Sequence, residues 1–192
     1  MPLTLANRIT FFRIFCVPVF ILLIIYYIQS VKHGNPKDLF RWAAAILFLG
    51  TVFLDAVDGY IARTRNQITR LGTIIDPLAD KALLLSGLLL LSLPQTNSFG
   101  VQLPVWFVLL VVSRDVILVL GAILIHFING TVNVRPRISG KATTFLQMVL
   151  IAWILVEIPQ NLFFIPLWSA AAFTLISAIQ YVMDGIMQFE KS

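Results

Sequence analysis

The sequence predicts an all-α integral membrane protein, a bundle of about six transmembrane helices. Of the 192 residues, 59% are hydrophobic and only 12% are charged, and the mean hydropathy is +0.91. Such a chain is too apolar for an ordinary soluble domain. Because no apolar run alternates with a period of two, the spans are predicted to be helices and not barrel strands.

Six apolar stretches approach the length that the hydrocarbon core of a bilayer requires, about 20 residues each. They are residues 9–28, 42–63, 72–93, 104–128, 142–156 and 162–187. Turn-forming residues separate most of them, at 34–36, 94–100, 130–136 and 159–161, whereas the polar link 64–71 has no Gly or Pro. Since these spans use nearly the whole chain, we predict one membrane domain over residues 1–192.

The net charge of +5 has a topological explanation. Lys32, Lys37 and Arg41 fall in the first loop on one side. The other side collects most of the basic residues, namely Arg8, Arg13, Arg63, Arg65, Arg70, Arg135, Arg137, Lys141 and Lys191. Basic loops face the cytoplasm, so we expect this side to be cytoplasmic, and the charge does not predict nucleic-acid binding. The single cysteine, Cys16, excludes a disulfide framework.

Acidic residues gather around the link between the second and third spans. Asp55 and Asp58 are three residues apart, and Asp76 and Asp80 are four apart, so each pair projects from one helix face. A carboxylate within a membrane helix costs on the order of 3 kcal/mol, so each needs a partner inside the bundle. If the link turns the third helix back beside the second, the four carboxylates converge.

Converging carboxylates repel one another unless cations lie between them, and oxygen-only ligands favour Mg²⁺, Mn²⁺ or Ca²⁺. The sequence therefore predicts a metal site. Two ions about 4 Å apart can clamp a diphosphate during an in-line displacement. Gly59 and Gly72 would let the backbone approach a nucleotide, and Arg63 would neutralise phosphate charge.

The acidic residues belong to a longer pattern with fixed spacing, D-x2-D-G-x2-A-R-x8-G-x3-D-x3-D. It is formed by Asp55, Asp58, Gly59, Ala62, Arg63, Gly72, Asp76 and Asp80. This pattern resembles the signature of the CDP-alcohol phosphatidyltransferases, and eight specified positions make it far more specific than a lone glycine motif.

The resemblance implies a function for each of these positions. The metal ligands would be Asp55, Asp58, Asp76 and Asp80, which together hold two divalent ions, Mg²⁺ or Mn²⁺. The ions would hold the diphosphate of CDP-diacylglycerol. Asp80 would also act as the catalytic base that takes the proton from the acceptor hydroxyl, and CMP would leave. Members of this family tend to be homodimers.

The resemblance extends more loosely to the start of the chain, where Asn7, Thr10, Arg13 and Pro18 form the run N-x2-T-x2-R-x4-P. The alternative is interfacial anchoring by Arg8 and Arg13. The resulting set of residues expected to bind CDP-diacylglycerol is Asn7, Thr10, Arg13, Asp58, Gly59, Ala62, Arg63 and Gly72.

A phosphorylated acceptor would need basic residues. Arg114 lies inside the fourth span beside Asp115, and an intramembrane arginine is a functional candidate by default, although a structural ion pair is the alternative. The other candidates are Arg135, Arg137 and Lys141, whose charge the positive-inside rule also explains. Lys141 is favoured because Ser139-Gly140-Lys141, followed by Thr144 and Gln147, resembles a run of phosphatidylglycerophosphate synthases.

Glycerol 3-phosphate is therefore the first predicted acceptor. Arg114-Asp115 in place of Arg-Glu, and residues 123–126 in place of a further arginine, resemble instead the eukaryotic-type cardiolipin synthases, which use phosphatidylglycerol. The donor pattern alone also leaves inositol phosphate and serine open. An ion-coupled transporter is an alternative from another class, but it predicts two related halves, and the sequence has no internal repeat. We expect a multi-pass protein of a bacterial inner membrane, with its active site on the cytoplasmic side.

Overall fold

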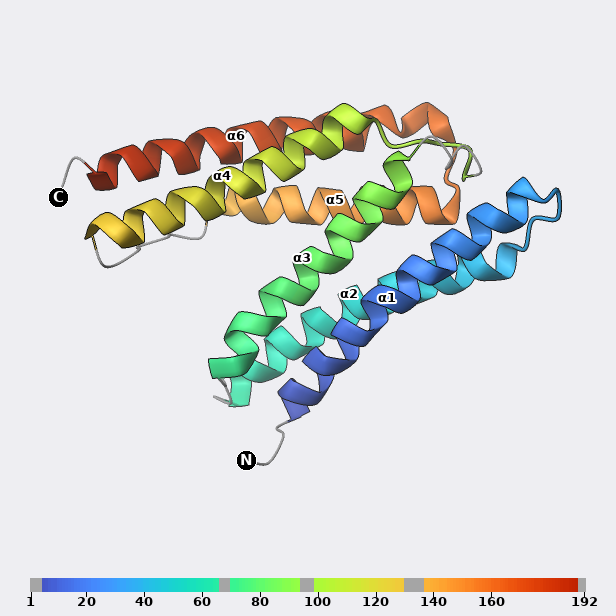
Figure 1. The fold of residues 1–192 in the computed structure, drawn as a ribbon, viewed down its shortest axis with the longest axis horizontal. Helices are drawn as coiled ribbons and strands as arrows, with labels where there is room; N and C mark the ends of the chain where they lie inside the picture. The colour runs from blue at the N-terminus through green and yellow to red at the C-terminus, as the bar shows by residue number, and fades with distance from the viewer. Residues whose placement is uncertain (1–4, 66–69, 94–98, 130–136, 190–192) are drawn as a thin grey trace. The chain divides into compact units, whose positions relative to one another are not determined.

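The structure is a computed structural model that describes residues 5–65, 70–93, 99–129 and 137–189, with side chains over 12–55, 78–93, 99–125, 127 and 137–187. Within these ranges the chain forms six long α-helices and no strand, which confirms the all-α prediction (Figure 1). They are α1 (Leu5–Lys32), α2 (Asp38–Arg65), α3 (Arg70–Ser92), α4 (Val105–Asn129), α5 (Ile138–Val156) and α6 (Phe164–Phe189), with a short 3₁₀ helix, η2 (Gln160–Leu162), before α6.

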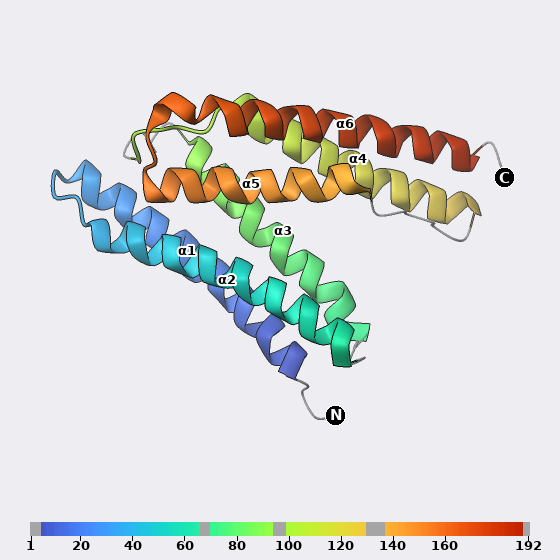
Figure 2. The same ribbon diagram turned by 180° about the vertical axis from the view of Figure 1, so that it is seen from behind.

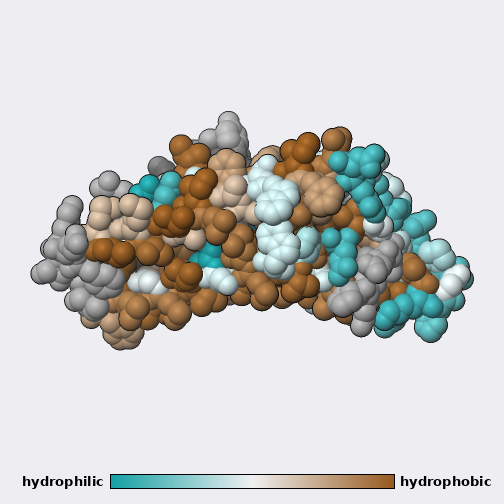
Figure 3. All heavy atoms as spheres, turned by 90° about the horizontal axis from the view of Figure 1, so that it is seen from above, coloured by the Kyte–Doolittle hydropathy of each residue, from teal (hydrophilic) through white to brown (hydrophobic). Residues whose placement is uncertain are grey.

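Four described segments are long and apolar enough to cross a bilayer by length and composition. They are Phe12–Lys32, Val105–Ile125, Ile138–Val156 and Gln160–Met187. The other two predicted spans form α2 and α3, which carry the charged residues of the candidate site. Many large hydrophobic side chains are exposed, and brown hydrophobic atoms dominate the face drawn in Figure 3. Since a soluble protein rarely exposes large apolar patches, this is the surface of an integral membrane protein.

The chain divides into two compact units. The first contains residues 1–102 and 151–158, and in it α1 packs against both α2 and α3, as Figures 1 and 2 show. Phe20 on α1 is fully buried against Phe48 on α2, with ring centroids 5.7 Å apart. Ala44 and Ala45 beside this contact are also buried, and their small side chains let the two helices approach closely.

The turn between α1 and α2 follows the predicted chemistry. Gly34 adopts a φ of +72°, the left-handed region that favours glycine, and its N–H donates to the carbonyl of Val31. The hydroxyl of Ser30 accepts from the N–H of Lys37. The prediction that Arg41 is a loop residue is wrong, because α2 already begins at Asp38 and Arg41 is buried in its first turn.

The second unit contains residues 103–150 and 159–192, and in it α4 packs against α6 (Figures 1 and 2). Phe107 on α4 and Ala170 on α6 are both fully buried. Trp106 and Trp168 stack at one end of this helix pair, with ring centroids 5.4 Å apart. The unit also includes the first part of α5, up to Leu150.

Candidate active site

The first unit brings three predicted site residues together. Arg13 on α1 is buried, and its Nη1 donates to Asp55 Oδ1 on α2 across 2.6 Å. Its Nη2 forms an ion pair with Asp80 Oδ1 on α3. One guanidinium therefore joins two carboxylates on different helices, which agrees with the expectation that the second and third helices direct acidic side chains to one place.

The charge balance of this cluster bears on metal binding. The side chain of Arg13 is only 7% exposed, whereas Asp55 and Asp80 are 38% and 27% exposed. Among the described side chains, two partly accessible carboxylates thus share one buried cation, which leaves a net negative charge that a further cation could balance. Their oxygens are the ligands that Mg²⁺ and Mn²⁺ prefer, so the donor set fits a hard divalent ion.

Asp55 and Asp80 are the only two of the four predicted metal ligands whose side chains fall in the described part of the chain. Over that part, no group of three or more His, Cys, Asp or Glu residues is close enough to hold an ion. Several further predicted residues occupy helical positions, but their side chains lie outside the described ones. These are Asn7 and Thr10 on α1, Asp58, Gly59, Ala62 and Arg63 on α2, and Gly72 and Asp76 on α3.

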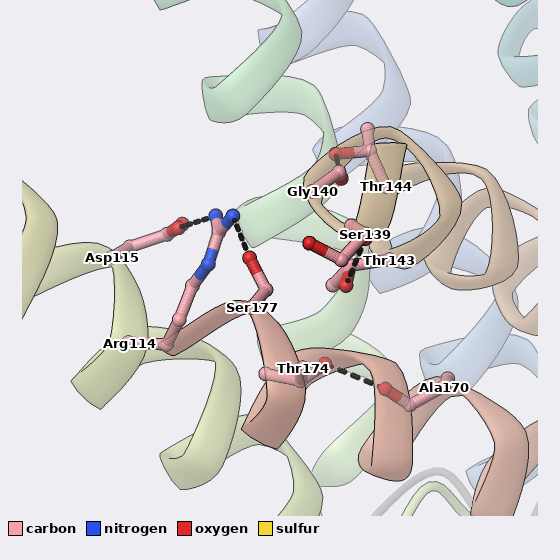
Figure 4. Close-up of polar contacts among 9 residues, drawn as sticks. All are labelled: Arg114, Asp115, Ser139, Gly140, Thr143, Thr144, Ala170, Thr174 and Ser177. Atoms are coloured by element: carbon pink, nitrogen blue, oxygen red, sulfur yellow. Dashed lines mark hydrogen bonds and ion pairs between the residues drawn. The ribbon is translucent and has the colours of Figure 1, made fainter. Parts of the chain in front are cut away.

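A second polar cluster lies in the second unit around Arg114 of α4 (Figure 4). The side chain of Arg114 is 10% exposed, its Nη1 donates to Asp115 Oδ1 across 2.8 Å, and its Nη2 donates to Ser177 Oγ on α6 across 2.8 Å. The guanidinium carbon also lies 5.5 Å from the ring centroid of Tyr181. The guanidinium of this intramembrane arginine is thus held by partners on two helices.

Gly140, in the first turn of α5, packs directly against this cluster. A Cβ atom at Gly140 would lie 3.2 Å from Arg114 Nη2, 3.4 Å from the hydroxyl of Tyr181 and 3.7 Å from Ser177 Oγ. The first of these distances is shorter than an ordinary contact, so a glycine lets α5 approach the guanidinium without displacing it. Figure 4 shows Gly140 facing the guanidinium, with Thr143 and Thr144 donating to carbonyls of their own helix.

The other predicted acceptor residues differ in their surroundings. Lys141 is exposed in the first turn of α5. Arg137 forms a bidentate ion pair with Asp184 on α6, in which Nε lies 2.7 Å from Oδ2 and Nη2 contacts Oδ1. The hydrogen bond to Asp184 raises the pKa of Arg137. Arg135 lies outside the described residues.

Sequence reasoning missed the polar residues of α6. Ser177, Gln180, Tyr181 and Asp184 follow one another at intervals of three, one and three residues within an otherwise apolar helix. That spacing places all four on one helix face, a signal that the sequence alone already contains. They contact residues that the sequence did single out, on α4 and at the start of α5.

The sequence of this chain is similar to a known protein family. The family model of the CDP-alcohol phosphatidyltransferases matches residues 3–180. A CDP-diacylglycerol--glycerol-3-phosphate 3-phosphatidyltransferase of Bacillus subtilis is 32% identical over 186 residues, which cover 92% of each chain. Proteins of the same name from Shigella flexneri and Escherichia coli are 31% identical over 189 residues, which cover 95% of this chain and 94% of each of theirs. The chain therefore belongs to the CDP-alcohol phosphatidyltransferase family of membrane enzymes.

Proposed function

We propose that this enzyme transfers the phosphatidyl group of CDP-diacylglycerol to glycerol 3-phosphate and releases CMP. The relatives from Bacillus subtilis and Escherichia coli carry the name of this reaction. The observation that carries the proposal is the shared contact of Asp55 and Asp80 with Arg13, since both aspartates belong to the family pattern.

Asp80 is the proposed catalytic base. The acceptor oxygen forms a bond to the phosphorus next to diacylglycerol, its proton passes to a carboxylate oxygen of Asp80, and the bond from that phosphorus to the CMP oxygen breaks. General-base assistance of this kind contributes about 10²-fold to 10⁴-fold in rate. Arg13 orients Asp80 and Asp55 through their shared ion pairs.

Two divalent ions, Mg²⁺ or Mn²⁺, are the proposed cofactor, held by Asp55 and Asp80 together with Asp58 and Asp76. When bound, such ions would neutralise the diphosphate and stabilise the oxygen that leaves with CMP. We propose that the lipid substrate, CDP-diacylglycerol, is bound beside the aspartates by the remaining residues predicted to contact it, namely Asn7, Thr10, Gly59, Ala62, Arg63 and Gly72.

Arg114 and Lys141 are the proposed ligands of the acceptor phosphate. The Nε of Arg114 is buried and has no hydrogen-bond partner among the described residues, so one donor of this guanidinium is uncommitted. Lys141 is exposed and adds a mobile positive charge. Arg137 is engaged by Asp184 and would act mainly by fixing the start of α5, and Arg135 would add positive charge to the same segment.

We further propose that residues 1–192 act as one membrane domain, as a homodimer in a bacterial inner membrane, with the chemistry on the cytoplasmic side. The basic residues of that side and the bacterial relatives support this setting. The transporter alternative is not retained, because the chain belongs to an enzyme family.

One assay tests the proposed reaction. Purified protein in detergent receives CDP-diacylglycerol, Mg²⁺ and one acceptor at a time: glycerol 3-phosphate, phosphatidylglycerol, inositol phosphate or serine. We expect CMP release with glycerol 3-phosphate only. Release with phosphatidylglycerol and not with glycerol 3-phosphate would show a cardiolipin synthase instead. The Arg114-Asp115 pair resembles the sequence of the eukaryotic-type enzymes with that activity.

A further inference from the structure

The polar face of α6, formed by Ser177, Gln180, Tyr181 and Asp184, is fully engaged by the two neighbouring helices. Ser177 and Tyr181 contact Arg114 on α4. Gln180 Oε1 accepts from Ser139 Oγ across 2.6 Å, and Asp184 pairs with Arg137. This face therefore fixes both the proposed phosphate-binding arginine and the turn of α5 that carries Lys141.

Ser177 makes the most specific of these contacts. It is fully buried, and its Oγ accepts from Arg114 Nη2, while Asp115 accepts from Nη1 (Figure 4). A guanidinium is planar, so two acceptors on its two terminal nitrogens determine the direction of the whole group. If the Ser177 hydroxyl were absent, Nη2 would lose its partner and the guanidinium could turn about its side-chain bonds.

Tyr181 closes another side of the same guanidinium. Its ring centroid lies 5.5 Å from the Arg114 guanidinium carbon, within the range of a cation–π contact. Tyr181 and Asp184 both lie beyond residue 180, where the match to the family model ends. Two of the four residues of this polar face therefore lie outside the region that the family model matches.

We propose, on the basis of the function proposed above, that Ser177 and Tyr181 are positioning residues that orient Arg114 toward the acceptor phosphate. Neither side chain needs to touch the substrate. Ser177 fixes the direction of the guanidinium through one hydrogen bond, and the ring of Tyr181 limits its movement. Their effect should therefore appear in the affinity for a phosphorylated acceptor and not in the affinity for CDP-diacylglycerol.

The test compares Ser177→Ala with a matched control, Thr174→Val. Thr174 is also fully buried, one turn earlier on α6, but its hydroxyl donates to the carbonyl of Ala170 in its own helix (Figure 4). For Ser177→Ala we expect the apparent KM for glycerol 3-phosphate to rise about tenfold, because a hydrogen bond to a charged group is lost. The KM for CDP-diacylglycerol should stay within twofold, and Thr174→Val should leave both values unchanged.

The two variants at Tyr181 separate the ring from the hydroxyl. Tyr181→Phe keeps the ring over Arg114 and should resemble the wild type, whereas Tyr181→Leu should raise the KM for the acceptor by several-fold. In an Arg114→Lys background, Ser177→Ala should add little, because two residues that act through one group are not additive.

Equal effects of Ser177→Ala and Thr174→Val, or full additivity with Arg114→Lys, would overturn the positioning role. The wild-type acceptor assay separates this outcome from failure of the proposed function. If the wild type uses phosphatidylglycerol instead, the proposed function fails, and the same variants then test positioning with that phosphate-bearing acceptor. A wild type that uses only serine would contradict both proposals.

Discussion

Arg41 Nη1 lies 2.6 Å from Glu157 Oε2, which ties the first turn of α2 to the residue that follows α5. The side chain of Arg41 is only 8% exposed, and its guanidinium carbon lies 5.3 Å from the ring centroid of Trp42. The hydroxyl of Tyr27 on α1 donates to Glu157 Oε1 across 3.4 Å. Side chains from α1 and α2 therefore meet at the carboxylate of Glu157.

Substitution of Glu157 should lower stability without preventing catalysis. Glu157→Ala leaves Arg41 buried without this carboxylate, and we expect a loss of about 1–3 kcal/mol. Glu157 also has a φ of 56°, so Glu157→Gly should be more stable than Glu157→Ala by about 1 kcal/mol. Thermal unfolding in detergent measures both, and an Ala variant as stable as the wild type would contradict the role of this ion pair.

Asp80→Asn should abolish CMP release while the protein stays folded. The amide retains the shape of the side chain but cannot take the acceptor proton, so we expect kcat to fall by about 10²-fold to 10⁴-fold. Asp38→Asn is the matched control, because Asp38 is an exposed acid at the start of α2. Normal turnover by the Asp80→Asn variant would exclude Asp80 as the base.

Removal of divalent ions should stop the reaction reversibly. Excess chelator should abolish CMP release, and added Mg²⁺ should restore it. Because a ligand that binds only the folded state raises its stability, Mg²⁺ should also raise the Tm of the wild type. This shift should be smaller for Asp55→Asn, and activity that persists in chelator would contradict the proposed cofactor.

Gly140→Ala should weaken binding of the acceptor. The new methyl group would lie 3.2 Å from Arg114 Nη2, so the guanidinium must move by a few tenths of an ångström. We expect the KM for glycerol 3-phosphate to rise about threefold to tenfold, as for the loss of one modest interaction. Gly121→Ala on α4 is the control, since no atom lies within 4 Å of its added Cβ. Equal kinetics of the two variants would show that Gly140 has no such role.

The Arg137–Asp184 pair should be insensitive to mild alkali. The hydrogen bond to Asp184 raises the pKa of Arg137, so the contribution of this group to stability is present below its ordinary pKa and is lost only as the pH rises through the higher folded value. Guanidinium groups remain ionised at all ordinary pH values. The difference in Tm between the wild type and Arg137→Gln should therefore stay constant from pH 7 to about pH 9.5. If the difference in Tm disappeared over this range, the stabilising ion pair between Arg137 and Asp184 would be contradicted.

The helices, and the approach of Asp55 and Asp80 to one place, could be predicted from local patterns, whereas the ion pairs that Arg13 forms with both aspartates were not predicted. Apolar runs determine where a helix can cross a bilayer, and acidic residues three or four apart share a face. The charge pattern, in contrast, placed Arg41 in a loop, because its nearby acid, Asp38, is exposed and does not reveal that Arg41 is buried. Its other partner, Glu157, is far away in the sequence. The second partner of Glu157, Tyr27, lies 130 residues before it. Only the packing of the helices brings such pairs together.

For Arg114 too, one contact could be predicted from the neighbouring sequence and the others depend on the packing of the helices. The sequence indicated that a charge inside a span needs a partner, and it offered Asp115 as the nearest acid. The second acceptor, Ser177, lies 63 residues away on α6, and a serine in an apolar helix is common enough to pass unnoticed. The close approach of Gly140 depends on distances across three helices, which no spacing rule supplies.

The polar face of α6 extends past residue 180, where the match to the family model ends. A protein shortened after residue 180 would retain every position of the family match, yet it would lack the aromatic ring beside Arg114 and the carboxylate that holds Arg137. Its sequence would still be assigned to the family, while the last turns of α6 could no longer brace the helices beside them. We therefore expect residues 181–184 to be needed for the contacts of Arg114 and Arg137, although they lie outside the match to the family model.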